Sequence, residues 1–272
     1  METVNQELFI SRMDANISYK TAILPLLPAG EVNILDYGGG VGSLSQIIKM
    51  SNPKAYVTIA DISKEMLEIA ETRGNADEYI LMPKQLPYNM FDAIILCSVL
   101  HEVEDKEQLI QDLALSLRPG GIIIIRDGFA EQPFDNKLNI IRPLNFNDAY
   151  DFYWKDCFGS IIFDLDLDFN QIEGTISGTE NDLRAFVDTY TWGRESVARE
   201  KHENRLWMNK DSVFELFYYP DNDRKGIFDM ESLTFTPICQ PNYFTHLQKI
   251  IELDRMWNTH VIATIKKKGD KL

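Results

Sequence analysis

The residues best suited to chemistry lie in the stretch Ile34–Ser45, where an acid and a glycine loop separate a short apolar strand from a helix. The pattern Asp-x-Gly-x-Gly-x-Gly begins at Asp36, and the loop contains Gly38, Gly39, Gly40 and Gly42. Glycines leave no side chain where a ligand approaches the backbone, and they adopt positive φ without strain. The helix that begins near Ser43 directs free N–H groups toward the same place. The stretch therefore predicts a binding site for a small ligand.

The spacing of these glycines distinguishes two nucleotide ligands, a nicotinamide or flavin dinucleotide and S-adenosylmethionine (SAM). The dinucleotide fingerprint places a small third residue three positions after its second glycine. Counted from Gly40, that position is Ser43, whereas the next glycine already comes at Gly42. Asp36 also suits a ligand with a positively charged amino group better than a pyrophosphate. Both observations favour SAM.

Three further polar residues follow predicted strands. Asp61 comes after the strand predicted at 56–60, about 20 residues beyond the loop, where a carboxylate can accept both ribose hydroxyls. His101 follows the buried strand Phe91–Ser98, and its ordinary pKa range would suit a general base. Its other interpretation is packing at the start of the next helix. Asp127, at the tip of the following strand, could orient His101, bind an acceptor or simply end the strand.

A second polar cluster lies at residues 189–203 and contains Trp192, Arg194, Arg199 and His202. Arginine is well suited to anionic substrate groups. Because Arg199 and Glu203 are four residues apart, a helical salt bridge would also explain them. We favour a substrate-facing lid over this structural role.

Composition limits the class of protein. A net charge of −15 and a pI of about 4.7 argue against a broad nucleic-acid surface. The first residues do not resemble a signal peptide, and no apolar run reaches the roughly 18 residues of a membrane span. The three cysteines form no CxxC pair and no ligand-spaced cluster with the four histidines. We therefore expect a cytoplasmic protein without a metal site.

The pattern of elements predicts an α/β fold. Strands predicted at 32–36, 56–60, 79–82, 91–98 and 122–126 alternate with helices, which implies right-handed crossovers and a parallel sheet. A helical region at 8–28 precedes them. Residues 129–208 lack this alternation, which resumes with a helix at 210–217 and strands at 232–238 and 258–266. We predict one domain from 1–128 plus 209–272, with 129–208 inserted as an α+β cap.

Taken together, the glycine loop, Asp61, the Phe91–Ser98 strand and the Leu117–Gly121 turn resemble the class I SAM-dependent methyltransferases. The resemblance covers about residues 30–128 and the closing strands. It implies a doubly wound, mostly parallel seven-stranded sheet with helices on both faces and an antiparallel last strand. It also implies contacts with SAM, to the methionine part by Asp36 and the Gly38–Gly42 backbone, to the ribose by Asp61, to the adenine by Ile62, and to the sulfonium end by Ser98 and Val99.

The sequence thus predicts SN2-type methyl transfer from SAM to an O, N or C nucleophile of a small-molecule acceptor enclosed by the cap. Two alternatives stay open. A basic face containing Arg126, Arg142, Arg194 and Arg199 would favour RNA or protein as the acceptor. Many members of the family have an acid four residues before the Leu-Pro step, where this chain has Met82, and that departure would fit a non-catalytic SAM-binding or partner-binding module. The acceptor and the oligomeric state, with a homodimer as one alternative, are left open.

Overall fold

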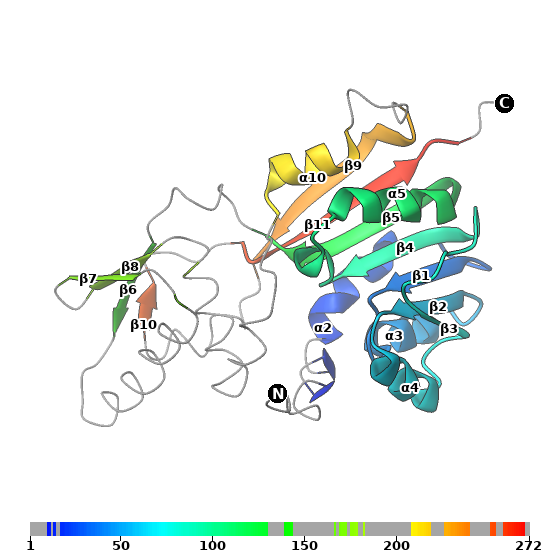
Figure 1. Ribbon diagram of the computed structural model, residues 1–272, viewed down its shortest axis with the longest axis horizontal. Coiled ribbons are helices and arrows are strands. Elements are labelled where there is room, and N and C mark those ends of the chain that lie inside the picture. Colours follow the sequence, from blue (N-terminus) through cyan, green and yellow to red (C-terminus); the bar gives the residue numbers. More distant parts are fainter. Residues whose placement is uncertain are drawn as a thin grey trace. The chain divides into compact units, whose positions relative to one another are not determined.

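The computed structural model divides the chain into two compact units (Figure 1). The larger unit comprises Glu7–Gly128, Leu206–Pro237 and Val261–Leu272, and the other comprises Met1–Gln6, Phe129–Arg205 and Ile238–His260. The structure describes residues 10–11, 13–14, 17–129, 139–143, 166, 169–172, 175–178, 182, 208–218, 226–239, 251–253 and 258–269.

A seven-stranded sheet, with the order β3-β2-β1-β4-β5-β11-β9, forms the centre of the larger unit. Its strands are β1 (Asn33–Tyr37), β2 (Tyr56–Asp61), β3 (Glu78–Leu81), β4 (Phe91–Cys97), β5 (Leu117–Gly128), β9 (Phe228–Ile238) and β11 (His260–Lys267). The five strands from β1 to β5 pair in parallel. Because parallel strands are buried on both faces, β4 reads as a continuous apolar run, and its residues 93–96 are fully buried.

Strand β11 runs antiparallel to its neighbours. At one end of the β9–β11 pair Lys268 N–H donates to Ile227 O (2.8 Å), and at the other Thr259 N–H donates to Ile238 O (2.9 Å). Beside β5, Phe129 N–H donates to Thr259 O (3.0 Å), so β11 begins where β5 ends. These bonds confirm the predicted mixed sheet with an antiparallel last strand.

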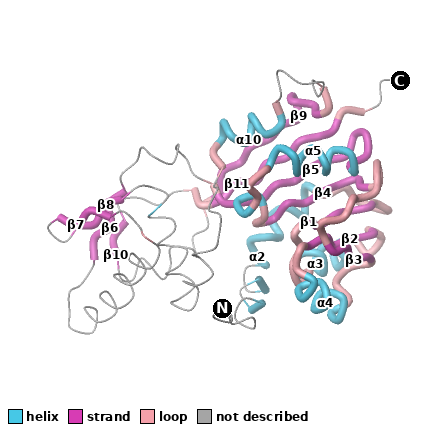
Figure 2. Tube along the Cα trace, in the orientation of Figure 1, coloured by secondary structure: helices cyan, strands magenta, loops and turns pink. Residues whose placement is uncertain are grey.

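Helices follow β1, β2 and β4 (Figure 2), whereas β3 leads to β4 without a helix, so the predicted alternation is interrupted there. The helices of the larger unit are α2 (Ile17–Lys20), the 3-10 helix η1 (Thr21–Leu26), α3 (Ser43–Ser51), α4 (Lys64–Arg73), the 3-10 helix η2 (Leu100–Glu102), α5 (Lys106–Ser116) and α10 (Lys210–Phe217). The N-cap of α4 is Ser63, whose Oγ accepts from Met66 N–H (3.3 Å). α5 and α10 contact each other, whereas α2 and η1 contact α3.

Strand β5 is longer than predicted. The sequence indicates a turn at 118–121, but the structure includes these residues in β5. Leu117 pairs with Phe91, and the register then shifts before Ala93 pairs with Ile122. Gly120 has φ +79°, so the glycines allow a bulge within a continuous strand instead of a separate turn.

The second unit contains a four-stranded sheet with the order β10-β6-β8-β7. Its described strands are β6 (Asn139–Pro143), β7 (Phe169–Ile172), β8 (Thr175–Gly178) and β10 (Ile251–Leu253), and their pairings are antiparallel. Most of the cap predicted at 129–208 lies outside the described residues, so its role stays a prediction.

Candidate active site

The glycine loop lies at the carboxyl end of β1, where open parallel sheets bind their ligands. Gly38, Gly40 and Gly42 have φ values of +71°, +55° and +75°, conformations that favour glycine. Gly38 N–H donates to Ala60 O at 2.7 Å. A Cβ added at Gly38 would overlap the Val99 side chain, so the loop packs directly against the segment after β4.

Asp36 lies beneath this loop. Its side chain is buried, and its Oδ2 accepts from Ser45 Oγ at 2.7 Å. A Cβ at Gly39 would come within 2.9 Å of the Asp36 carboxylate. Burial raises the pKa of Asp36, although the hydrogen bond from Ser45 and the charge of Lys20 oppose the rise. The geometry gives Asp36 a supporting position under the loop, and its contact with a ligand stays a prediction.

Asp61 connects the loop to the next strand. Its Oδ2 accepts from Gly40 N–H and its Oδ1 from Ser63 N–H, both at 2.8 Å. A carboxylate oxygen has two acceptor positions, so each oxygen can still accept one hydroxyl, as a ribose diol requires. Next to Asp61, the Ile62 side chain is 80% exposed at the tip of β2. An apolar side chain in this position provides a surface for a heterocyclic base.

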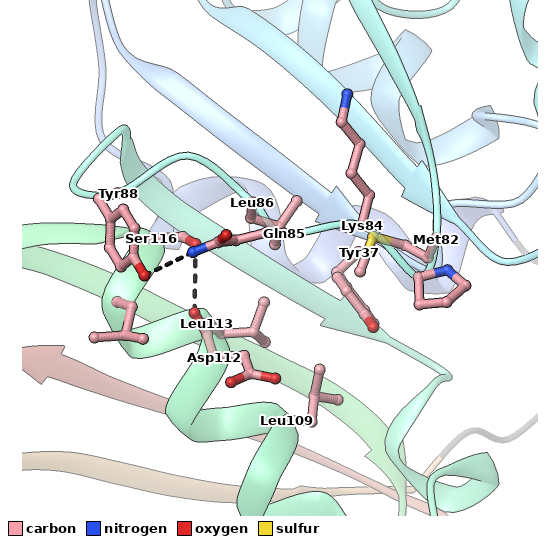
Figure 3. Close-up of a pocket in the computed structure, with 12 residues that line it drawn as sticks. Tyr37, Met82, Lys84, Gln85, Leu86, Tyr88, Leu109, Asp112, Leu113 and Ser116 are labelled. Carbon is pink, nitrogen blue, oxygen red and sulfur yellow. Dashed lines mark hydrogen bonds between the residues drawn. The ribbon is translucent and has the colours of Figure 1, made fainter.

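A pocket of about 450 Å³ lies next to β1, between residues 82–88 and one face of α5. Figure 3 shows Tyr37, Gln85 and Asp112 among its lining residues, with Gln85 Nε2 donating to the Tyr88 hydroxyl at 2.6 Å. Burial raises the pKa of Tyr37, and the charges of Asp112 and Asp61 add to the rise. The Tyr37 phenol therefore lies close enough to Asp61 for the two to interact electrostatically.

Ser98 and Val99 form the edge of the site after β4. Ser98 is exposed and has φ +60°, an uncommon conformation for a residue other than glycine. Its N–H donates to Arg126 O at 2.8 Å. Val99 is half-buried against Gly38. The structure therefore brings the loop into contact with Asp61 and Val99, next to Ile62 and Ser98, and their contacts with SAM stay a prediction.

His101 and Asp127 form a buried pair beneath this edge. His101 Nδ1 lies 2.6 Å from Asp127 Oδ1, which also accepts from Gly128 N–H at 2.6 Å. Asp127 Oδ2 accepts from Val99 N–H at 2.9 Å and from Leu100 N–H at 2.6 Å. His101 Nε2 lies 3.3 Å from Glu102 Oε1. Asp127 thus binds the η2 segment to the end of β5.

This pairing argues against His101 as a general base. Burial alone would lower the pKa of His101, but the charge and hydrogen bond of Asp127, assisted by Glu102, raise it to about 10. Burial would raise the pKa of Asp127, yet His101 and the backbone N–H groups lower it overall. Both shifts favour the charged forms, imidazolium and carboxylate, and an imidazolium cannot accept a proton. The geometry favours a positioning role for both residues.

The sequence does not indicate three residues that contact the loop. A Cβ at Gly40 would lie 3.1 Å from Met13 Sδ, and Asp14 accepts from Ser43 Oγ at 2.5 Å. Asn75 Nδ2 donates to Val41 O at 2.8 Å. The only sequence signals are a helical region at 8–28 and the position of Asn75 after the Gly74 helix cap.

Other features considered from the sequence are not part of this site. Trp192, Arg194, Arg199 and His202 lie outside the described residues. Arg126 is only 3% exposed, so it does not contribute to a basic surface. Within the described ranges, no group of three acidic, cysteine or histidine residues could hold a metal ion. No helix in that part of the chain is long and apolar enough to cross a membrane.

We expect Gly42→Ala to lower the free energy of unfolding by about 2–5 kcal/mol, measured by urea titration. A left-handed alanine costs about 1–2 kcal/mol, and overpacking adds about 1–3 kcal/mol, because the new Cβ would lie 2.7 Å from Ile59 Cδ1 and 2.8 Å from Asn75 Cβ. Gly74→Ala is the matched control, since Gly74 has φ +64° but no neighbour within 4 Å of an added Cβ. Equal losses in the two variants would contradict the packing of the loop.

The His101–Asp127 pair predicts a pH-dependent stability. The folded-state pKa of His101, about 10, lies above its ordinary value of 6.5. Its stabilisation is therefore complete below pH 6.5 and is lost as the pH rises toward 10. We expect the difference in unfolding free energy between the wild type and His101→Gln to shrink across this range, measured by urea titration. A difference that stays constant would show that folding does not raise the pKa of His101.

The chain is similar to known methyltransferases. Residues 35–125 match the family of methyltransferase domains. An uncharacterized methyltransferase of Mycobacterium tuberculosis is 32% identical over 117 residues, which are 41% of this chain and 58% of that protein. The ubiquinone/menaquinone biosynthesis C-methyltransferase UbiE of Vibrio cholerae is 29% identical over 140 residues, 47% of this chain and 51% of that protein. The chain thus spans a little over half the length of these curated relatives.

Solved structures show the same fold at low sequence identity. A SAM-dependent methyltransferase from Mesorhizobium loti gives a TM-score of 0.56 at 17% identity, covering 93% of this chain and all of that chain (100%). The plantazolicin methyltransferase BpumL, in complex with a monoazolic desmethylPZN analogue and SAH, gives 0.51 at 15% identity, covering 97% and 86%. The matched residues contain the glycine loop, Asp61 and His101. Residues 35–125 therefore match a methyltransferase domain, and the larger unit has the fold of SAM-dependent methyltransferases.

Proposed function

We propose that the protein transfers the methyl group of SAM to an O, N or C nucleophile of a small-molecule acceptor. The observation that carries this proposal is the link between the glycine loop and Asp61 through the Gly40 N–H group (2.8 Å). It places a carboxylate beside a loop where added side chains would collide with Val99 or Ile59. A carboxylate beside an open glycine loop fits a ligand whose nucleoside contacts Asp61 and whose remaining part lies along the loop backbone.

The residues present fit SAM in several places. Asp61 would accept the ribose hydroxyls, Ile62 would pack on the adenine, and the loop backbone would contact the methionine part. Ser98 and Val99 would line the sulfonium end. SAM supplies an activated methyl group and its own leaving group, so the protein mainly orients the acceptor in line with the reacting bond.

Support for a small acceptor comes from relatives and from charge. UbiE is named for ubiquinone/menaquinone biosynthesis, and BpumL binds an analogue of desmethylPZN. The net charge of −15 opposes a polyanionic substrate. We retain Trp192, Arg194, Arg199 and His202 as proposed acceptor contacts in the 129–208 cap. A cytoplasmic location is part of this proposal, and a homodimer stays an open alternative.

We assign His101 and Asp127 to holding Ser98 and Val99 in place. Two of the hydrogen bonds to Asp127 come from Val99 and Leu100, so loss of the carboxylate would release the edge of the site. Each buried N–H donor left without its acceptor costs about 1–3 kcal/mol. In this proposal the pair supports methyl transfer through geometry and takes no proton from the acceptor.

One observation keeps a non-catalytic SAM-binding module as the second candidate. Met82 has no carboxylate, and its N–H already donates to Asp61 O (2.8 Å), while Pro83 has no N–H. These two residues therefore offer the adenine neither a side-chain carboxylate nor a free amide donor. The polar groups that remain nearby are those of the pocket, including Tyr37 and Gln85 (Figure 3). Turnover on a panel of small acceptors distinguishes the candidates, because a module would bind SAM without releasing SAH.

Calorimetry with SAH tests the cofactor site. We expect Asp61→Asn to weaken SAH binding about tenfold or more, since hydrogen bonds to charged groups contribute about 1.5–3 kcal/mol. Asp77→Asn is the matched control, because Asp77 likewise accepts a backbone N–H, from Val57 (2.8 Å), but near the start of β2. If the wild type bound neither SAM nor SAH, the proposed function would be wrong. An unchanged affinity in Asp61→Asn would exclude only the ribose contact.

A further inference from the structure

Arg126 is a buried cation that the proposed function does not use. It is 3% exposed near the end of β5, one residue before Asp127. Arginine stays protonated at all physiological pH values, and a buried charge is costly unless a counter-charge faces it. Within the described part of the chain, no carboxylate forms an ion pair with Arg126.

The hydrogen bonds that Arg126 makes are few and long. Its Nε donates to Tyr19 O at 3.3 Å, and its Nη1 donates to Ser98 Oγ at 3.5 Å. A guanidinium has five N–H donors, and good N–H···O bonds measure about 2.7–3.2 Å. The two long bonds to Tyr19 O and Ser98 Oγ therefore leave most of the N–H donors of the Arg126 guanidinium unused.

The adjacent acid does not neutralise Arg126. Successive side chains of a strand point to opposite faces of the sheet. Accordingly Asp127 contacts the η2 segment, while Arg126 reaches Tyr19 in α2. Asp127 is already occupied by His101 and three backbone N–H groups. The Arg126 side chain thus lies on the face of the sheet that α2 covers.

The position of Arg126 places it at the cofactor site. Arg126 pairs in register with Cys97, and its carbonyl accepts from Ser98 N–H. Ser98 is exposed, and the next residue, Val99, packs on Gly38. The guanidinium therefore lies beside an exposed hydroxyl, one residue from the contact between β4 and the glycine loop.

We propose that Arg126 binds a carboxylate at the end of the site farthest from Asp61. The fork of the guanidinium matches the two oxygens of a carboxylate. The strand order β2-β1-β4-β5 puts Arg126 three strands away from the ribose acid. Two sources share this chemistry, the amino-acid carboxylate of SAM and a carboxylate on the acceptor. The inference deepens the proposed function and rests on it.

The first arm of the test uses calorimetry with SAH and with methylthioadenosine, which lacks the amino-acid carboxylate. If the carboxylate is that of the cofactor, Arg126→Met should bind SAH about 10- to 100-fold more weakly and methylthioadenosine as the wild type does. Arg126→Lys keeps the charge but loses the fork, so it should show a smaller loss for SAH alone. Arg118→Met is the control on the same strand, because Arg118 pairs with Asp92 near its other end.

The second arm addresses the acceptor. With SAH bound, succinate should raise the melting temperature of the wild type, neutral succinamide should not, and Arg126→Met should lose the response to succinate. Either arm supports the proposal and identifies the source. It is overturned if Arg126→Met and Arg126→Lys bind SAH like the wild type and succinate acts equally on wild type and variants.

Stability separates this role from a purely structural one. Replacing an unpaired buried charge with a side chain of similar size should cost little, so Arg126→Met should melt near the wild-type temperature without ligand. A large drop in melting temperature with unchanged affinities would make Arg126 structural and overturn the proposal. Failure of the wild type to bind SAH would instead contradict the proposed function, while the succinate arm, run without SAH, would still test Arg126.

Discussion

The shape of the site depends on the hydrogen bonds that the buried carboxylate of Asp127 accepts. Asp127 accepts from the backbone of Val99, Leu100 and Gly128 and pairs with His101. The bonds from Val99, Leu100 and His101 connect the end of β5 to the segment after β4, and the bond from Gly128 lies within the end of β5. A buried carboxylate is tolerated only when such donors surround it. The segment after β4 is thereby held where Val99 packs on the glycine loop.

The loop itself is held from three sides. Asp36 and Ser45 support it from below, Asp61 accepts from Gly40, and Asn75 donates to the Val41 carbonyl. These contacts use side chains to fix backbone groups, so the loop keeps its shape through the neighbouring strands and α4. A preformed loop loses less conformational entropy when a ligand binds. In the proposed function, the same acids would serve both the fold and the ligand.

The sequence predicts most of this arrangement because its signals are local. The parallel strand order and most of the βα alternation follow from patterns of neighbouring residues, and the structure confirms them. The role of His101 could not be predicted in this way, because its pKa depends on burial and on Asp127, 26 residues away. Likewise, only the fold shows that Arg126 is buried and forms no ion pair with a described carboxylate. The contacts of Met13 and Asp14 depend on tertiary packing that no short pattern encodes.

The position of β11 has a consequence for how the sheet assembles. β11 lies between β5 and β9, yet it is the last of the three in sequence and is separated from β5 by about 130 residues. Until residues 260–267 are in place, β5 has an unpaired edge and β9 has no neighbour in the sheet. Closing so long a connection is slow, because chain entropy is lost before the pairing is gained. The half of the sheet that carries the glycine loop and Asp61 can therefore form early, whereas the strand beside Arg126 is completed late.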